Sequence, residues 1–486
     1  MNWSLIMKVQ GYLLVILGIM MFFPLMISFH YGGGDLNAIA LSIATTLITG
    51  MVFILIFKSD KKFKAREGFA SVSLGWILAA LFGGLPYFFH GSFGPYINCV
   101  FEAMSGFTTT GSTILSDIES IPRGLLFWRS LTHWLGGMGI VLFTIAILPM
   151  FGIAPGQLYN AEVPGPTKDR LSPKIKDTAK ILWLIYIGLT IIETIFLMFG
   201  GMDLYTAINH SFATVATGGF STLNNSVLGF HSVYIEIVIT IFMFLAGINF
   251  ALHFYLIKGR FRDFFKDSEL KFYTAVVTIT TILISLNIYF SSGIEKYTAN
   301  YGRALLDSAF QVISITTTTG FMTADFNLWP SFSALLLVTL MFFGGCAGST
   351  GGGMKQIRIL ILFKHLSNEI KKLAHPRAFF SLRVGEEHVE NHVVRNVLGF
   401  AILFVAIFTV STLFLAGMGY DIITSFTAAI SCLGNIGPGL ARVGAIENFG
   451  FFDSYSKGVL IFCMLLGRLE IYSVLILVYS VIFRKR

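Results

Sequence analysis

Ten apolar stretches, each long enough for a membrane-spanning helix, recur along this 486-residue chain and restrict what it can fold into. Crossing the hydrocarbon core of a bilayer takes about 20 mainly apolar helical residues. The stretches lie at 9–29, 36–57, 68–89, 125–149, 180–200, 232–257, 273–291, 331–365, 393–416 and 455–483. Charged residues make up only 12% of the chain, against about 25% in ordinary soluble proteins. We therefore predict an all-α membrane protein whose main solvent is the lipid bilayer.

Basic residues gather between alternate apolar stretches. Clusters of Lys and Arg lie at 58–66, 168–180, 258–271, 364–383 and 484–486, whereas 31–37 and 201–231 contain neither residue. Such alternation is the positive-inside pattern, which places basic loops in the cytoplasm. The net charge of +8 is thus interpreted as topology and not as nucleic-acid binding. Ten spans then predict a multi-pass protein with both termini in the cytoplasm.

Four further segments are too short and too polar to span, and each lies between two spans on the outer side. They are 96–113, 204–222, 304–323 and 422–440, ending in FTTTGST, VATGGFST, ITTTTGF and CLGNIGPG. Their glycines Gly111, Gly218, Gly320 and Gly437 are separated by roughly 100–120 residues, which indicates an internal repeat. Two spans in each repeat return the chain to the cytoplasm, so all four repeats have one orientation.

The predicted fold is therefore four like-oriented span–pore-helix–span repeats around one pore, plus two extra N-terminal transmembrane helices. The predicted boundaries are 1–60 for the two N-terminal helices, 61–150 for repeat 1, 151–258 for repeat 2 with a preceding cytoplasmic linker, 259–366 for repeat 3 with a broken second helix, and 367–486 for repeat 4.

Each of the four short segments is predicted to begin as a short helix, here called a half-helix, and to end in a polar loop. These four polar loops, here called the Gly/Thr loops, are predicted to form a selectivity filter. Backbone without helical hydrogen bonds is tolerated at membrane depth only where it is buried or faces water. Its carbonyl oxygens can replace the hydration shell of an ion, and no ring of Asp or Glu accompanies them, which favours potassium. The predicted filter residues are Thr109, Thr110, Gly111, Ala216, Thr217, Gly218, Thr318, Thr319, Gly320, Asn435, Ile436 and Gly437. The alternative interpretation is that the Gly/Thr clusters are ordinary packing motifs, because small residues are common where membrane helices meet.

These four motifs, with GGCAGSTGGGMK (344–355) and LLGRLEIY (465–472), resemble the TrkH-type subunit of the bacterial Trk/Ktr potassium-uptake superfamily. The resemblance covers the chain from about residue 8 to its end. It implies potassium uptake across the bacterial inner membrane, a homodimer, and control by a cytoplasmic nucleotide-binding ring of TrkA type. No organic cofactor is expected in this chain. Asn435 and Ile436 depart from the threonines of the other loops.

The stretch 331–365 is too long for one span, because as a single helix it would reach about 50 Å. We predict two half-helices and a glycine break, about 22 Å from the outer end and therefore below the filter. The resemblance implies that this break is a gate. The predicted gate residues are Gly344, Gly345, Gly348, Gly351, Gly352, Gly353 and Arg468. Arg468 lies within the last apolar stretch and needs a partner or a water-filled cavity there. The partner would be loop carbonyls or a carboxylate, with Glu470 expected to pair elsewhere.

Other polar residues in apolar surroundings are interpreted as structural. Glu102 and Asp307 are predicted to anchor the first and third half-helices by hydrogen bonds, and His133 and His210 to be satisfied packing histidines. No nucleophile–base arrangement occurs, so no enzyme is predicted. The alternative function is a symporter that couples potassium to protons or sodium. It would need a carboxylate on the pathway, and Glu193 and Glu236 lie in candidate spans.

Overall fold

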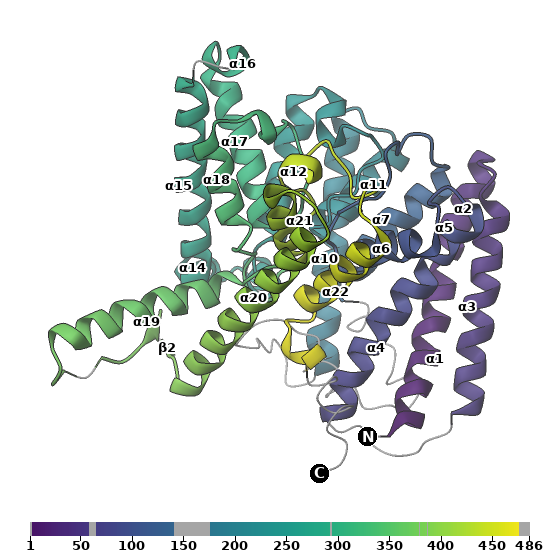
Figure 1. Cartoon of the computed structure of the whole chain (residues 1–486), viewed down its shortest axis with the longest axis horizontal. Coiled ribbons are helices and arrows are strands. Elements are labelled where there is room, and N and C mark those ends of the chain that lie inside the picture. Colours follow the sequence, from purple (N-terminus) through teal and green to yellow (C-terminus); the bar gives the residue numbers. More distant parts are fainter. Residues whose placement is uncertain are drawn as a thin grey trace.

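The computed structural model consists of α-helices packed side by side, with one small two-stranded β-ribbon (Figure 1). It describes residues 2–57, 65–139, 175–291, 294–378, 380–385 and 387–475. The ribbon pairs β1 (Arg383–Val384) with β2 (Glu387–His388). Within the described ranges the protein is therefore an all-helical membrane protein, as predicted.

Three helices form the N-terminal part: α1 (Trp3–Met20), α2 (Phe22–Tyr31) and α3 (Leu36–Ile56). Helices α1 and α3 pack along each other, and their backbones come close at two facing glycines. A Cβ atom on Gly11 would lie 2.8 Å from the carbonyl oxygen of Gly50. Small residues allow membrane helices to approach in this way.

One local order then occurs four times: a long helix, a short helix, a Gly/Thr loop and a second helix. The long helices are α4 (Ala65–Gly83), α10 (Ile175–Phe199), α15 (Ser268–Phe290) and α20 (Asn391–Gly417). The short helices are α6 (Tyr96–Phe107), α11 (Leu204–Val215), α17 (Tyr301–Thr316) and α21 (Ile422–Gly434). The second helices are α7 (Arg123–Gly137), α12 (Val233–Ala246), α18 (Ser331–Leu340) and α22 (Ser454–Arg468).

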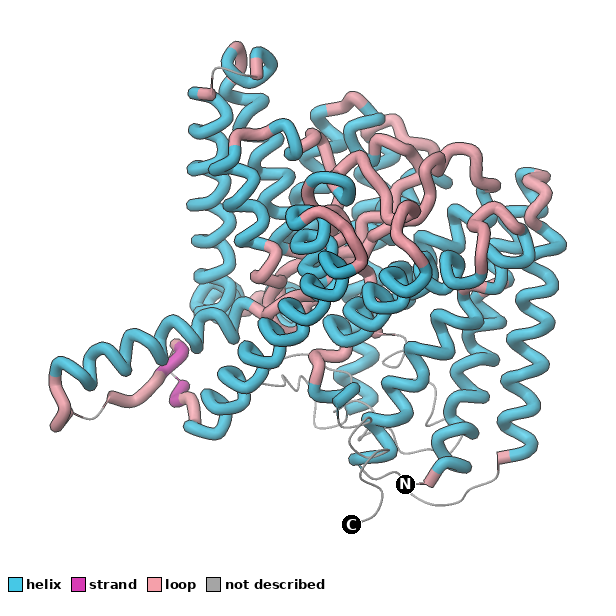
Figure 2. Tube along the Cα trace, viewed as in Figure 1, coloured by secondary structure: helices cyan, strands magenta, loops and turns pink. Residues whose placement is uncertain are grey.

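Each short helix packs against both other helices of its group. Neighbouring groups meet where α7 packs on α11, α12 on α17, and α22 on α6. The last group therefore contacts the first. Figure 2 shows many of the loops in the centre of the molecule, with helices around them.

Smaller elements join these groups. They are α5 (Leu85–His90), α13 (Phe250–Ile257), α14 (Phe261–Lys266), α16 (Glu295–Thr298), α19 (Gln356–Ala374) and 3₁₀ turns at Ser226–Phe230, Phe326–Leu328 and Ala441–Val443. Helix α19 projects from the body at the end of the molecule where α14 lies (Figure 1).

Polarity is distributed as expected for a protein in lipid. Large apolar side chains on the outside of the long helices are exposed, among them Phe199 at 78%, Phe290 at 76% and Ile402 at 68%. Charged side chains such as Glu102 and Arg129 are instead buried inside. A water-soluble protein would show the reverse arrangement.

Six helical segments of the described chain are long and apolar enough to cross a membrane, or seven if the bent pair α12–α13 is one span. The six match the predicted stretches 9–29, 36–57, 68–89, 180–200, 273–291 and 393–416. The remaining four predicted stretches contain the second helices of the four groups. Two of them, 125–149 and 455–483, extend beyond the described residues.

The other two stretches are interrupted. The prediction of two half-helices with a glycine break in 331–365 is confirmed by α18 and α19, which a loop separates. The predicted span at 232–257 is not one straight helix, because the chain bends by 101° between α12 and α13. The α18–α19 loop supplies the missing hydrogen bonds at this bend: Cys346 N donates to Gly247 O (2.9 Å) and Phe250 N to Gly348 O (3.0 Å).

Candidate functional site

The four Gly/Thr loops share one backbone conformation. In each, the residue just after the helix end has a positive φ of 54° to 61°: these are Thr109, Thr217, Thr318 and Asn435. Two residues later a glycine has a φ of 79° to 106°: these are Gly111, Gly219, Gly320 and Gly437. Glycine adopts such angles without the steric penalty of a Cβ atom. The loops are thus structurally equivalent despite their different sequences.

The second loop is displaced by one residue from its predicted alignment. Thr110 N donates to Ser105 O five residues back, and in the second loop it is Gly218 N that donates to Ala213 O in this way. The equivalent triplet is therefore Thr217–Gly218–Gly219, and the predicted Ala216–Thr217–Gly218 needs correction. The prediction matched the Thr-Gly pair by identity, whereas the backbone places the second of two glycines at the equivalent position.

The four loops contact one another in a closed ring. A Cβ atom on Gly111 would overlap the carbonyl oxygen of Gly218, and one on Gly219 would overlap that of Thr319. A Cβ atom on Gly320 would likewise overlap the carbonyl oxygen of Ile436. The fourth loop closes on the first, since a Cβ on Gly437 would lie 2.9 Å from Thr110 O. Each glycine thus makes room for a carbonyl of the next loop.

Threonine hydroxyls form hydrogen bonds both within the Gly/Thr loops and between two of them. Thr108 Oγ1 lies 2.8 Å from Thr110 Oγ1, and the pair Thr317–Thr319 has the same separation. In the fourth loop the amide of Asn435 donates to Thr110 Oγ1 (2.9 Å) and so joins the last loop to the first.

Buried polar side chains brace the short helices, as predicted for Glu102 and Asp307. Glu102 accepts from Arg129 Nε (2.8 Å) and from Ile114 N (3.0 Å). Asp307 accepts from Thr323 Oγ1 (2.9 Å) and from Arg303, which also contacts Glu236. The contacts with Ile114 and Thr323 fix α6 and α17 to the chain segments that follow their Gly/Thr loops.

The two histidines differ. His210 bonds Thr206 O (2.8 Å) and Ser221 Oγ (2.9 Å), so its prediction as a satisfied packing residue is confirmed. His133 is buried and stacks on Phe220, with ring centroids 4.0 Å apart. Its ring nitrogens have no hydrogen-bond partner among the described residues, so the predicted satisfaction of His133 is wrong.

The glycine-rich loop between α18 and α19 (341–355) lies against the Gly/Thr loops. Gly352 N donates to Thr318 Oγ1 (2.7 Å), and Thr350 Oγ1 donates to Val215 O (3.0 Å). A Cβ atom on Gly352 would lie 2.5 Å from Gly434 O. The predicted gate glycines thus form a loop in direct contact with three of the four Gly/Thr loops or the helix ends before them.

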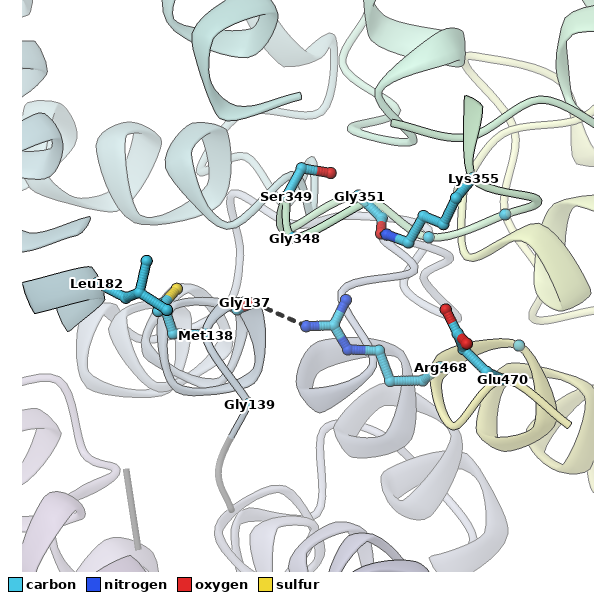
Figure 3. Close-up of a pocket in the computed structure, with 13 residues that line it drawn as sticks. Gly137, Met138, Gly139, Leu182, Gly348, Ser349, Gly351, Lys355, Arg468 and Glu470 are labelled. Atoms are coloured by element: carbon cyan, nitrogen blue, oxygen red, sulfur yellow. Dashed lines mark hydrogen bonds between the residues drawn. The ribbon is translucent and has the colours of Figure 1, made fainter. Parts of the chain in front are cut away.

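Arg468 is the last residue of α22 and reaches across to this loop (Figure 3). Its guanidinium donates to Thr350 O (2.8 Å), Gly136 O (2.5 Å) and Gly137 O (2.8 Å). A longer contact of 3.3 Å reaches Thr109 Oγ1. Of the two kinds of partner predicted for Arg468, the structure therefore has carbonyls. Glu470 pairs with Arg358 instead, as expected.

A family model described as TrkH, cation transport protein, matches residues 36–483 of the chain. The chain belongs to the TrkH family.

Relatives of this TrkH-family chain match it over its whole length. The Trk system potassium uptake protein TrkH of Escherichia coli (strain K12) is 38% identical, with 100% of both chains covered. TrkG of the same organism is 34% identical over 96% of both chains. The crystal structure of the potassium transporter TrkH from Vibrio parahaemolyticus superposes with a TM-score of 0.88, at 34% identity and full coverage of both chains. The family predicted by the resemblance is thus confirmed, the fold is that of TrkH, and the chain is a transporter and not an enzyme.

In this TrkH-family chain the sequence pattern missed three features of the site. Gly219 directly follows Gly218, and this pair of glycines was the available signal. Thr350 stands within a run of glycines, and its hydroxyl group was the available signal, because it can bond a neighbouring helix end. Glu269 had no sequence signal, because its contacts with the α18–α19 loop join residues far apart in the chain.

Proposed function

We propose that this protein takes up potassium through a single pore on the axis of the ring formed by the four Gly/Thr loops. The relatives named for potassium uptake support the ion, and the closed ring of loop contacts supports the route. In this proposal the four helix groups are like-oriented repeats, at 61–150, 151–258, 259–366 and 367–486, and residues 1–60 supply the two extra N-terminal spans.

Carbonyl oxygens supply the ion-binding chemistry in this proposal. The predicted filter set, with Gly219 in place of Ala216, surrounds the axis, and its carbonyls replace the water around a dehydrated potassium ion. The short helices α6, α11, α17 and α21 end at the loops, so their negative C-terminal ends add to the attraction for a cation. Among the described residues, no group of three or more His, Cys, Asp or Glu side chains is placed to hold a metal ion. The ring therefore acts through neutral oxygen atoms.

The α18–α19 loop and Arg468 act as the gate in the same proposal. The loop lies against the helix ends that precede the Gly/Thr loops, and the Arg468 guanidinium is bound to its Thr350 carbonyl. A positive charge next to Thr109 opposes the passage of cations. Transport requires the loop and the arginine to move aside.

A passive, gated pore is favoured over a symporter. Glu236 is bound by Arg303 through a 2.6 Å contact, which occupies the carboxylate. Glu193 is buried in α10, which packs against α11. Neither carboxylate belongs to the ring.

The proposal includes the setting of the pore. The protein is a multi-pass component of the bacterial inner membrane with both termini cytoplasmic, forms a homodimer, and is controlled by a TrkA-type nucleotide-binding ring. The family match supports the Trk system as its context.

Flux measurements in liposomes test the proposal. Purified protein is expected to pass potassium and rubidium better than sodium and lithium at an imposed voltage with no proton gradient. Equal sodium and potassium flux would refute the filter. Potassium flux that requires a proton or sodium gradient would instead establish the symporter.

A further inference from the structure

The base of the α18–α19 loop is closed by hydrogen bonds between its two ends. Gly344 N donates to Met354 O (2.7 Å), and Gln356 N donates to Gly345 O (3.2 Å). The Gln356 side chain adds a bond to Gly344 O (2.8 Å). We call these two chain segments, 343–347 and 354–357, the neck of the loop.

A side chain from another helix bridges this neck. Glu269 is the second residue of α15 and is buried. Its Oε1 atom accepts from Ala347 N (2.7 Å) on one side of the neck and from Ile357 N (2.8 Å) on the other. A carboxyl oxygen has more than one acceptor position, so it can serve both donors at once. One oxygen atom therefore joins both ends of the loop to the start of α15.

Helix α19 depends on this contact because it has no cap of its own. The first N–H groups of a helix need acceptors from outside it, and Asp or Asn at the N-cap position commonly supplies one. Helices α11, α21 and α22 have Asp203, Asp421 and Asp453 there. The corresponding residue of α19 is Lys355, which has only donors and donates to Gly351 O. Glu269 takes the role of the missing cap from α15.

We propose that Glu269 is a positioning residue that keeps the neck closed and thereby holds the tip of the loop beneath the Gly/Thr loops. The tip is held there by Thr350 and Gly352, which bond Val215 O and Thr318 Oγ1. This inference rests on the proposed gating function and adds its point of control. Helix α14 (Phe261–Lys266) precedes α15 and packs against it, so a displacement of α14 that shifts α15 as a whole would pull Glu269 from the neck and release the gate.

The experiment compares Glu269→Ala, Glu269→Gln and the control Asp267→Ala in the full chain. Asp267 caps α15 itself through Leu270 N (2.7 Å), so its loss perturbs the same helix end without breaking the bridge. Rubidium flux into liposomes without any regulatory partner is expected to rise about fivefold or more in Glu269→Ala, the lower end of typical coupling between sites. Glu269→Gln keeps an oxygen acceptor and should stay close to wild type, as should the Asp267→Ala control.

A second measurement reports the neck directly. Cys346 lies in the neck and is only 1% exposed. Its labelling by a membrane-permeant maleimide, quantified by peptide mapping, is expected to accelerate in Glu269→Ala and not in the other two variants. Glu269→Asp, whose shorter side chain cannot reach both donors, should be intermediate and serves if Glu269→Ala does not fold.

The outcomes separate this inference from the proposed function. Wild-type flux together with wild-type protection of Cys346 in Glu269→Ala would overturn it, and so would equal acceleration in Asp267→Ala. If the wild-type protein passes no potassium, the proposed function fails. The labelling contrast between Glu269→Ala and Asp267→Ala then still shows whether Glu269 closes the neck.

Discussion

Asn435 occupies in the fourth loop the position that threonine holds in the other three, and its contacts show what side chains do there. Thr318 Oγ1 accepts from Gly352 N of the α18–α19 loop, and Thr109 Oγ1 lies near Arg468. Asn435 instead donates to Thr110 Oγ1 and to Met464 O (2.9 Å each). At the residue scale, the side chain at this position therefore joins the ring of loops to the structure around it.

Removing Arg468 is expected to increase basal potassium flux without loss of potassium-over-sodium preference. Arg468→Ala removes the bonds to the Thr350, Gly136 and Gly137 carbonyls. A hydrogen bond to a charged group contributes about 1.5–3 kcal/mol, so an increase of about tenfold is expected in liposome flux. Arg442→Ala is the control, since Arg442 is exposed and stacks on Phe451. Unchanged flux in a folded Arg468→Ala protein would remove the arginine from the gate.

Changing Gly219 to serine is expected to weaken selectivity as much as changing Gly111 does. At both positions a Cβ atom would overlap a carbonyl oxygen of the neighbouring loop and would disfavour the positive φ. Gly458→Ser in α22 is the control, because a Cβ atom there meets open space. The ratio of potassium to sodium flux in liposomes is the measurement. A selective Gly219→Ser protein would contradict the corrected alignment of the second loop.

The second loop also shows which features of the Gly/Thr loops can be predicted from the sequence and which cannot. Threonine and glycine in the right order located all four loops, because the pattern of polar residues between apolar stretches is strong. The one-residue displacement in the second loop was hidden, since Thr217–Gly218 resembles the Thr-Gly pairs of the other loops. The positive φ of Thr217 and Gly219 and the hydrogen bond from Gly218 N to Ala213 O distinguish the two alignments.

At the scale of elements, the second helix of the second group shows why one break was predictable and another was not. Six glycines within 344–353 made the break after α18 evident. The bend after α12 has only Gly247 as a local signal, and it is stabilised by bonds to Cys346 and Gly348, about one hundred residues away. Apolar composition predicts that a segment lies in the membrane but not where tertiary contacts interrupt its helix.

Shortening the α18–α19 loop is expected to open the pathway. Deleting Gly351–Gly353 removes the Gly352 N bond to Thr318 Oγ1 and retracts the tip from the helix ends it contacts. Basal flux should rise while potassium-over-sodium preference stays nearly intact, which paired liposome fluxes would show. If selectivity is lost instead, the loop belongs to the filter; if neither quantity changes in a folded protein, the loop is only packing.

At the scale of the whole molecule, the first three helix groups contact one another in chain order, α19 packs on α20 of the fourth group, and the fourth group meets the first through α22 and α6. The order of helices and loops within a group could be predicted because span length and loop position are both visible in a sequence. Partners are different, since a cytoplasmic ring and a second copy contact surfaces that an isolated chain does not identify.

Control by a separate nucleotide-binding partner is the prediction at this scale. The basic linkers at 150–180 and 367–391 are expected to bind the regulatory ring, so nucleotide should change rubidium flux only when that ring is added. The isolated protein in liposomes with nucleotide alone is the control. A response to nucleotide without the partner would show that the chain itself binds the nucleotide.

The ring of four loops is encoded by one gene segment after another and not by four copies of one sequence. A mutation therefore changes one loop of the ring and leaves the other three unchanged, whereas in a tetramer of identical subunits every mutation changes all four. Each loop can thus differ from the others, and Asn435 and Ile436 differ from the residues at the equivalent positions of the other three loops. An engineer has the same freedom, because each loop is open to replacement on its own.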